Sequence, residues 1–306
     1  MMKKRILTLC LMIGLVSAIT AQEMLVGTYN IRMKNDGDSL KGDCWGKRCQ
    51  VICDQVNFMS PAIFGTQEVL HVQLQDLLHG LHNYDYIGVA RDDGKTKGEY
   101  AAIFYDKSRI RLLDHGDFWL NETPDRPALG WDAACIRICT WGKFKDLRSG
   151  KKFYFFNLHM DHVGRVARRE AARLVVSKIR EIAEKRPVVL TGDFNVDQTD
   201  EIYRIFSESG ILSDSYTMAD IRFAENGTFN AFKPQLKTTS RIDHIFVSPS
   251  MKVDAYGVLT DSYWTPDPDS DNTQKASDAP QEISFSTYTR RNPSDHYPVM
   301  VRIMWR

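Results

Sequence analysis

Six short segments place acidic, amide and histidine side chains at the ends of apolar runs or just before them. They are Tyr29-Asn30-Ile31-Arg32, Gln67-Glu68, Asn157-Leu158-His159-Met160-Asp161-His162, Gly192-Asp193-Phe194-Asn195, Arg241-Ile242-Asp243 and Ser294-Asp295-His296. A carboxylate that follows a buried strand, as Glu68 does, points into a crevice where a hard cation can bind its oxygens. Asp193 and Asn195 are two residues apart, so in extended backbone their side chains face the same way. One can orient or deprotonate a water while the other donates to a phosphate oxygen.

His296 has a side chain that titrates near neutral pH, and it follows the carboxylate of Asp295. A separate carboxylate can fix the tautomer of such a histidine and favour its charged form. Asp243 would do this if the fold brings its strand next to His296. Taken singly, these segments also fit tight turns, surface loops or the first turn of a helix. Their joint occurrence is what favours a site.

The elements that must position these residues are mostly strands. Strand-like segments lie at 25–31, 62–66, 86–89, 101–105, 136–144, 153–158, 187–190, 242–247 and 297–303. Apolar residues at helical spacing indicate three helices, within 45–56, 74–81 and 171–182. The pattern is too rich in strands for a simple doubly wound sheet, so we predict an α/β fold of two packed sheets covered by helices. The polar segment 261–292 is predicted to be one long surface loop, because only one strand follows it.

The N-terminus has the order of a secretory signal peptide over residues 1–21: three cations, an apolar run from Ile6 to Ile19, and a small residue at Ala21. The apolar run is too short for a comfortable membrane span. We therefore expect an exported protein, periplasmic or secreted, with one domain over residues 22–306 and no transmembrane segment in the mature chain.

Loss of Lys3, Lys4 and Arg5 with the signal peptide would take the formal net charge from +1 to −2. Proteins that bind duplex DNA through many phosphates normally carry a strong basic excess. The charge balance thus argues against a dedicated duplex-DNA binder and favours a small phosphoester: a nucleotide, sugar phosphate or lipid head group. A monomer is expected.

Cysteines remain after the signal peptide at five positions, an odd number that leaves at least one thiol unpaired: Cys44, Cys49, Cys53, Cys135 and Cys139. Small buried apolar residues are their ordinary role. Their spacing and the nearby histidines do not match the usual zinc sites.

The chain resembles the endonuclease/exonuclease/phosphatase superfamily in an ordered set of motifs: Asn30, Gln67-Glu68, His159, Gly192-Asp193-Phe194-Asn195, Asp243 and Ser294-Asp295-His296. The resemblance spans essentially the whole mature chain. Further segments at 98–105, 118–124 and 130–134 look closer to the deadenylase-like branch and to uncharacterised secreted bacterial members than to DNase I. The resemblance implies the DNase I-like fold, a four-layer sandwich of two mixed β-sheets flanked by helices.

The resemblance also implies a metal site for Mg²⁺ or Mn²⁺. Glu68 would be the principal ligand, with Asn30 beside it contacting metal or phosphate. Asp295 would support the metal or the attacking water. Bound cations of this kind neutralise phosphoryl charge and stabilise a leaving oxygen.

The remaining motif residues would carry the catalysis that the resemblance implies. Asp193 would orient or deprotonate the attacking water, and Asn195 would hold the phosphate. His296, oriented by Asp243, would polarise the scissile phosphate, while His159 would contact a phosphate oxygen or assist the leaving group. The general base stays open between Asp193 and His296.

Three further residues are candidates for contact with the substrate. Arg32 is two residues after Asn30 and could reach a phosphate. Tyr105 has a precedent in the resembled family for a phosphate contact. Trp119 lies in a predicted loop with Pro and Asn, from which its ring could stack on a base or sugar.

These observations predict a divalent-metal-dependent hydrolase, a phosphoesterase that cleaves a phosphodiester or phosphomonoester by attack of water. An endonuclease or exonuclease acting on single-stranded nucleic acid is one alternative. A non-catalytic binding protein on the same fold is another, because fold alone does not guarantee activity. A carboxylate-based glycosidase is a third, and it would need no metal.

Overall fold

A computed structural model describes residues 23–223, 226–267, 277–278 and 280–305, and the predicted signal peptide at 1–21 lies outside this part of the chain. Within it, one sheet consists, from edge to edge, of seven strands: β10 (Ile221–Phe223), β12 (Met251–Val258), β15 (Val299–Trp305), β1 (Glu23–Asn30), β2 (Ile63–Gln67), β4 (Ile103–Asp106) and β3 (Tyr84–Ile87). The second sheet has six described strands: β5 (Ile110–Trp119), β6 (Ile138–Asp146), β7 (Lys152–His159), β8 (Val188–Asp193), β11 (Asp243–Val247) and β9 (Ser213–Asp214). Both sheets are mixed, since β1 runs parallel to β2 and β7 parallel to β8 among antiparallel pairs.

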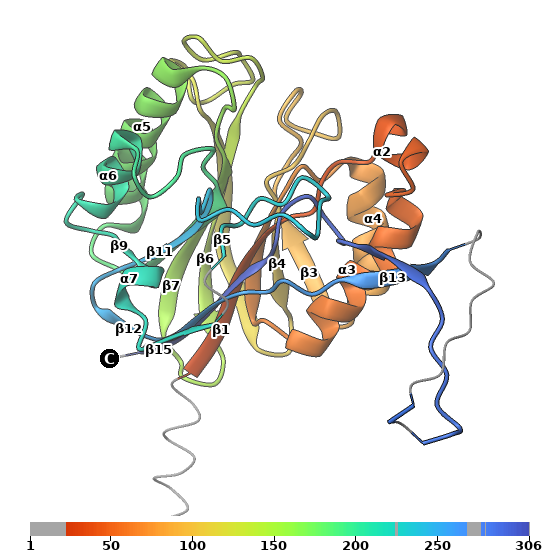
Figure 1. The fold of residues 1–306 in the computed structure, drawn as a ribbon. Coiled ribbons are helices and arrows are strands. Elements are labelled where there is room, and N and C mark those ends of the chain that lie inside the picture. Colours follow the sequence, from red (N-terminus) through yellow and green to blue (C-terminus); the bar gives the residue numbers. More distant parts are fainter. Residues whose placement is uncertain (1–22, 224–225, 268–276, 279, 306) are drawn as a thin grey trace, which may run out of the picture.

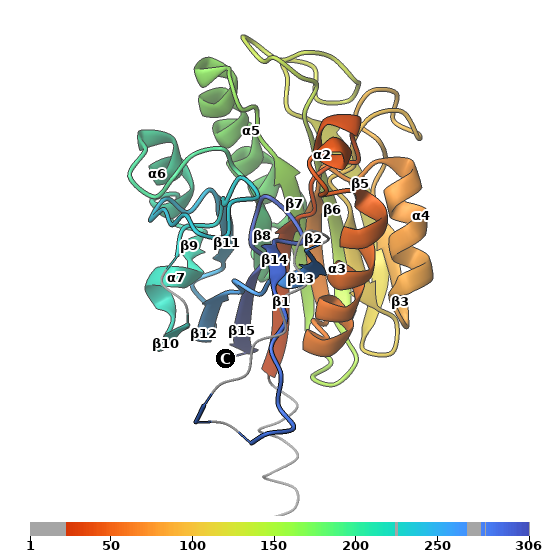
Figure 2. The same cartoon turned by 45° about the vertical axis from the view of Figure 1, so that its right-hand side comes forward.

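Helices cover the outer faces of both sheets (Figure 1). The first sheet carries α3 (Trp45–Met59) and α4 (His71–Gly80), and the second carries α5 (Arg165–Ala183) and α6 (Glu201–Ser207). Shorter helices are α2 (Asp36–Leu40) and α7 (Ser215–Met218). The rotated view shows the two sheets lying between the helical layers (Figure 2). The predicted four-layer DNase I-like sandwich is confirmed.

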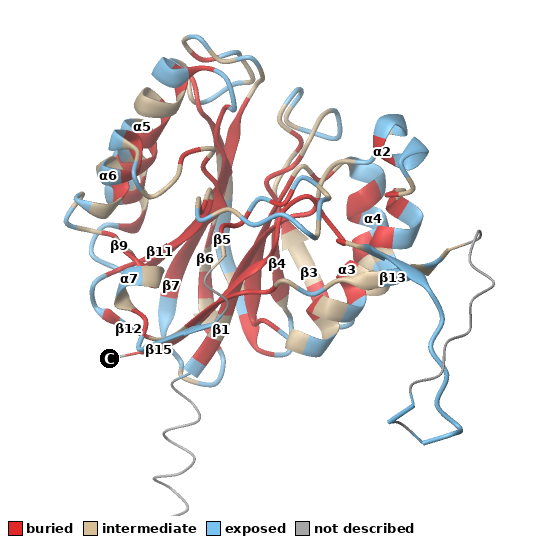
Figure 3. Ribbon diagram, in the orientation of Figure 1, coloured by how far each residue is buried: buried red, intermediate tan, exposed pale blue. Residues whose placement is uncertain are grey.

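Alternation along the strands explains this layering. In β7, Phe153 and Phe155 enter the core between the sheets, whereas Tyr154 and Phe156 pack in the core beneath α5. Successive side chains of a strand point to opposite faces, so a strand covered on both sides is apolar throughout. Figure 3 shows the result, with buried strands in the middle and exposed residues on the outer sides of the helices.

The segment 261–292 departs from the predicted continuous loop. Two of its parts pair as antiparallel strands, β13 (Tyr263–Pro266) and β14 (Tyr288–Arg291), while residues 268–276 and 279 lie outside the described chain. The ribbon projects from the body of the molecule (Figure 1). Its base is tied down because Arg291 Nη1 donates to Asp43 Oδ1 at 2.9 Å. The polar composition concealed the pairing of Tyr263-Trp264-Thr265 with Thr289 and its neighbours.

Two further observations concern the cysteines and the helices of the described residues. The cysteines Cys44, Cys49, Cys53, Cys135 and Cys139 are all free thiols. Among the helices that the structure describes, none combines the length and apolar character needed to cross a membrane.

Candidate active site

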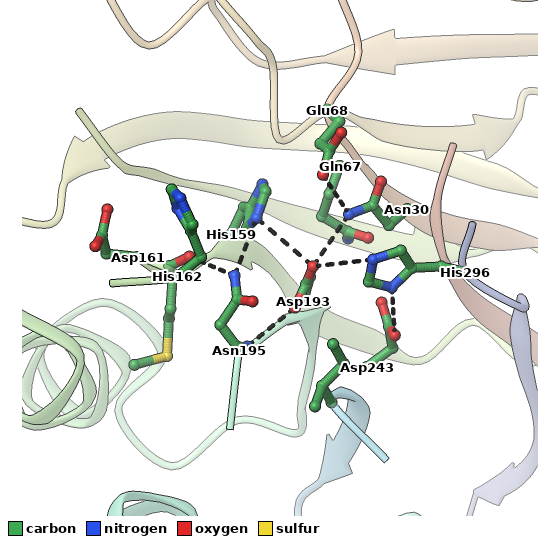
Figure 4. A network of polar contacts seen from close by, with 12 residues as sticks. Asn30, Gln67, Glu68, His159, Asp161, His162, Asp193, Asn195, Asp243 and His296 are labelled. Atoms are coloured by element: carbon green, nitrogen blue, oxygen red, sulfur yellow. Dashed lines mark hydrogen bonds and ion pairs between the residues drawn. The ribbon is translucent and has the colours of Figure 1, made fainter. Parts of the chain in front are cut away.

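The predicted site residues converge where strands of both sheets end (Figure 4). Asn30 is the last residue of β1 and lies opposite Gln67, the last residue of β2. His159 ends β7 and lies opposite Asp193, which ends β8. Asp243 opens the antiparallel strand β11, also opposite Asp193. The two sheets therefore deliver their polar strand ends to one cleft.

A buried polar link beneath the cleft joins the two sheets. Gln67 Nε2 donates to Asn157 Oδ1 at 2.7 Å, and Asn157 Nδ2 donates to the backbone oxygen of Thr66 at 2.8 Å. Gly65 makes this close approach possible, because a Cβ atom at that position would overlap the Asn157 amide. A fully satisfied buried network fixes one arrangement of the packed layers.

Asp193 is the hub of the site and is only 2% exposed. Its Oδ2 accepts from Asn30 Nδ2 at 3.0 Å, and its Oδ1 accepts from the backbone N–H of Asn195 at 2.9 Å. Burial, followed by repulsion from the Asp243 carboxylate, raises the pKa of Asp193 to about 7. A carboxyl group with such a pKa can accept a proton near neutral pH.

His296 and Asp243 form the predicted pair. His296 Nδ1 lies 2.8 Å from Asp243 Oδ2, and its Nε2 lies 3.7 Å from Asp193 Oδ2. Burial alone would lower the pKa of His296, but the charges of Asp243 and Asp193 outweigh it and raise that pKa well above the usual value. His296 is therefore a cationic hydrogen-bond donor at the floor of the cleft.

His159 has the opposite character. Its Nε2 lies 3.6 Å from Asp193 Oδ2 and 3.3 Å from Asn195 Nδ2. Burial, together with the positive charges of Arg137 and Arg91, lowers the pKa of His159 well below the usual value. The site thus holds one charged and one neutral imidazole on either side of the same carboxylate.

The side of the cleft formed by Glu68 and Asp295 is rich in acceptors. Asn30 Nδ2 donates to Glu68 Oε1 at 3.0 Å, while Arg32 Nη1 lies 3.8 Å from Glu68 and 3.5 Å from Asp295. Burial and the Glu68 charge raise the pKa of Asp295 against the opposing effect of His296. Ligand atoms of Glu68, His159 and Asp193 lie within 4.8 Å of one another. The two carboxylates of this set suit a hard divalent cation, which prefers oxygen ligands.

The backbone is strained at three residues of the cleft. Glu68, Asn195 and Arg32 adopt left-handed conformations with φ of 62°, 50° and 58°. Non-glycine residues rarely adopt this region, and such strain persists where the surrounding structure imposes it. Glu68 directly follows the last residue of β2, and Arg32 and Asn195 lie two residues after the ends of β1 and β8. The backbone therefore turns sharply just after it leaves each strand, and these side chains line the cleft.

The cleft has a volume of about 420 Å³ and is lined by motif residues and by others that sequence reasoning missed. The lining residues that were not among the predicted site residues are Met33, Arg91, Glu99, Cys135, Arg137, His162, Phe229 and Ile242. Glu99 lies in one of the segments that resemble the deadenylase-like branch, and His162 lies three residues after His159, so both carried a local signal. Asn30 and Asp243 are fully buried and lie beneath the lining, in contact with Asp193 or His296.

Asp161 supports this wall of the cleft. Its Oδ1 accepts from the backbone N–H groups of Val163 and Gly164, and its Oδ2 from those of Ala134 and Cys135. These bonds outweigh burial and lower the pKa of Asp161 to about 2. Although Cys135 and His162 are near enough to share a metal with it, the carboxylate is already saturated with donors. We therefore interpret Asp161 as a structural anchor.

Two predicted substrate contacts lie away from the cleft. Tyr105 is in β4 and packs in the core, where its ring centroid lies 5.4 Å from that of Phe144. Trp119 ends β5 instead of lying in a loop, is buried, and donates from Nε1 to the backbone oxygen of Arg91 at 2.7 Å. Neither lines the cleft, so their positions give no support to a substrate contact. Of the three candidates, only Arg32 lines the cleft.

Comparison with known proteins agrees with this geometry. The model of the Endonuclease/Exonuclease/phosphatase family matches residues 27–296. A mannosyl-6-phosphatase of Bacteroides thetaiotaomicron is 49% identical, with a TM-score of 0.85 over 92% of this chain and 100% of that one. A Bacteroides vulgatus family member is 37% identical, with a TM-score of 0.78 over 93% and 99% of the two chains. The human Nocturnin catalytic domain shares the fold at 17% identity, with a TM-score of 0.66 over 93% and 94%. Because the family model spans every motif that meets in the cleft, from Asn30 to His296, the chain belongs to the endonuclease/exonuclease/phosphatase family.

Proposed function

We propose that the protein hydrolyses a phosphate monoester of a small sugar, with a divalent cation bound in the cleft. The observation that carries the phosphoesterase assignment is the meeting of Asp193, His296 and Glu68 in the lining of one cleft. The sugar assignment is supported by the similarity, at 49% identity over nearly the full length of both chains, to a mannosyl-6-phosphatase.

The shape and charge of the cleft support a small substrate. A volume of about 420 Å³ suits a ligand of modest size. The lining of the cleft includes Arg91, Glu99 and His162, whose hydrogen-bonding groups match the hydroxyls of a sugar. The whole chain has a formal net charge of only +1, which is unlike proteins that track a nucleic-acid backbone.

The proposed reaction adds a water oxygen to phosphorus while the bond from phosphorus to the sugar oxygen breaks. Asp193 orients the water and accepts its proton. His296, held charged by Asp243, donates a hydrogen bond to a phosphoryl oxygen and so stabilises the charge that develops there. The sugar oxygen takes up a proton from solvent and leaves as the alcohol, and Asp193 later returns its proton to solvent.

Glu68, with Asn30 and Asp295, would hold Mg²⁺ or Mn²⁺, which supplies neutralisation of phosphoryl charge when bound. Arg32 lies between Glu68 and Asp295 and keeps both carboxylates oriented toward the cleft. The same guanidinium is positioned to contact a phosphate oxygen.

A panel of substrates tests the proposal. Mannose 6-phosphate, other sugar phosphates, a nucleotide, a simple phosphodiester and a single-stranded oligonucleotide would be assayed with Mg²⁺ or Mn²⁺. We expect sugar phosphates to be preferred and His296→Ala to lower kcat at least about 100-fold. The matched control is His115→Ala, which removes an exposed histidine of β5.

Two of the alternative functions have their own results in this panel. Preferred cleavage of the oligonucleotide would identify a nuclease instead. Binding of a phosphoester without turnover would indicate a non-catalytic protein. Equal activity of the wild type and His296→Ala would reject the assignment of the site.

A further inference from the structure

Arg48 of α3 is a fully buried cation that the proposed reaction does not use. Its side chain is 0% exposed, and its four hydrogen bonds within the described residues all go to backbone carbonyl oxygens. Moving a guanidinium out of water is unfavourable, and an apolar side chain like those of Ile52 and Val56 on the same face of α3 would fill the space without that penalty. The contribution of Arg48 therefore lies in the groups that its donors hold together.

These donors reach two segments that are far apart in the sequence. Arg48 Nη1 donates to the oxygen of Ile31 at 2.7 Å and to that of Pro293 at 3.0 Å, and Nη2 donates to the oxygen of Arg32 at 3.1 Å. One planar guanidinium thus forms a junction between the chain that leaves β1 and the chain that enters the Ser294-Asp295-His296 motif.

The two segments carry the acidic side of the cleft. Asn30 and Arg32 belong to the first segment, and Asp295 belongs to the second. The contact of 3.5 Å between Arg32 Nη1 and Asp295 Oδ2 therefore spans the junction that Arg48 makes. The Asp193 side of the cleft has separate support, because β8 is paired with β7 and β11.

A left-handed backbone at Arg32 is part of the junction. Its φ is 58°, and its carbonyl oxygen accepts from Arg48 Nη2 at 3.1 Å and from Gln73 Nε2 at 3.0 Å. Such a conformation persists where the surrounding contacts impose it. Loss of the guanidinium donors would let this turn relax and would carry the Arg32 side chain away from Asp295.

We propose that Arg48 is a positioning residue that sets the separation between Arg32 and Asp295, and with it the shape of the acidic side of the cleft. This role needs a guanidinium, which offers five N–H donors in fixed directions, whereas the ammonium of lysine is a point charge with three rotatable donors. The positioning follows from the contacts alone, while its effect on metal binding and turnover rests on the proposed function.

Arg48→Lys tests the geometry because it keeps the buried charge and removes the planar set of donors. In a crystal structure of the metal-free variant, the contact between Arg32 and Asp295 should be broken, and that between His296 and Asp243 should remain. Titration with Mn²⁺ in the absence of substrate, followed by the electron paramagnetic resonance of the free ion, should give a Kd about 10-fold higher or more. The kcat should fall about 10-fold or more.

Arg109→Lys is the matched control, because it removes the planar donors of another largely buried arginine. Arg109 donates to Asp146 and to the backbone oxygen of Glu23. Glu23 is the first residue of β1, at the end of the strand opposite Asn30 and the cleft. The control should be less stable in urea than the wild type and should keep the wild-type kcat and Kd for Mn²⁺.

Arg48→Met covers the case in which Arg48→Lys does not fold, because it keeps a long side chain and removes the buried charge. It should fold and show the same weakened binding of Mn²⁺. An intact contact between Arg32 and Asp295 in Arg48→Lys would overturn the proposal, since the charge alone would then suffice. Failure of both variants to fold would also overturn it, because Arg48 would then serve folding and not the geometry of the cleft. If the wild type hydrolyses no phosphoester, the proposed function fails, and the crystal structures still decide the positioning.

Discussion

Replacing Asp193 by Asn should make the metal-free protein more stable while it removes activity. The pKa of Asp193 is raised from 3.8 to about 7, chiefly by burial, so the folded state disfavours the ionised form. Each pKa unit corresponds to about 1.4 kcal/mol, which gives a cost of about 4 kcal/mol at pH 8. The substitution sacrifices the hydrogen bond from Asn30 Nδ2, worth about 1–2 kcal/mol. We expect a net gain of about 2 kcal/mol.

The dependence on pH has a defined sign. A carboxyl with a raised pKa in the folded state costs nothing below pH 3.8, and the cost grows as pH rises toward about 7. At pH 5.5 about 2 kcal/mol of the cost remains, so the variant and the wild type should be nearly equal there.

Urea unfolding in EDTA, followed by tryptophan fluorescence, measures both values. Saturating Mn²⁺ should stabilise both proteins, because Glu68, Asn30 and Asp295 would still hold the cation in the variant; a cation at 100 times its Kd adds about 2.7 kcal/mol. If Asp193→Asn is the less stable protein in EDTA at pH 8, the ionised Asp193 carboxylate does not destabilise the folded state and the reasoning is wrong.

Three other outcomes are expected. Gly65→Ala should lower the free energy of unfolding by about 1–3 kcal/mol, because the added Cβ clashes with the Asn157 amide. The control Gly46→Ala should not lower it, because the Cβ added there meets nothing within 4 Å. Chemical denaturation of both variants measures the difference. Asp161→Asn should destabilise by about 2 kcal/mol at pH 7, and this difference should shrink as pH falls from 3.8 through about 2; a constant difference in acid titrations would contradict the lowered pKa. Mg²⁺ or Mn²⁺ should raise the melting temperature of the wild type and leave that of Glu68→Gln unchanged; equal shifts would place the cation elsewhere.

Much of the fold could be predicted because its strands are apolar on both faces. Segments such as Phe153–Leu158 and Val188–Leu190 stand out in the sequence since helices cover them from outside and the other sheet from inside. The strands that were missed lack this pattern. β5 contains Asp114-His115-Gly116-Asp117 and is an edge strand, while β12 has a register shift between Val253 and Ala255 that interrupts its alternation.

The residues of the site likewise fall into those that could be predicted from the sequence and those that could not. Glu68, Asp193 and His296 could be predicted because each lies beside a recognisable strand within a spaced motif. Arg91 and Arg137 could not, since they are held at the cleft by ion pairs with Glu99 and Asp161 and belong to no local sequence pattern. The positions of Tyr105 and Trp119 outside the cleft lining could not be predicted, because an aromatic residue has the same sequence appearance whether it stacks on a ligand or on a core residue such as Phe144.

The hydrogen bond from Gln67 to Asn157 joins the two sheets beneath the cleft, so the geometry of the cleft depends on the relative position of the sheets. Asn30 comes from one sheet and Asp193 from the other, and their contact is a single hydrogen bond of 3.0 Å. A small slip of one sheet past its partner would leave every strand and helix intact, and so leave circular dichroism unchanged, yet it would part these two side chains. Turnover should therefore fail under heat or pressure before ellipticity does.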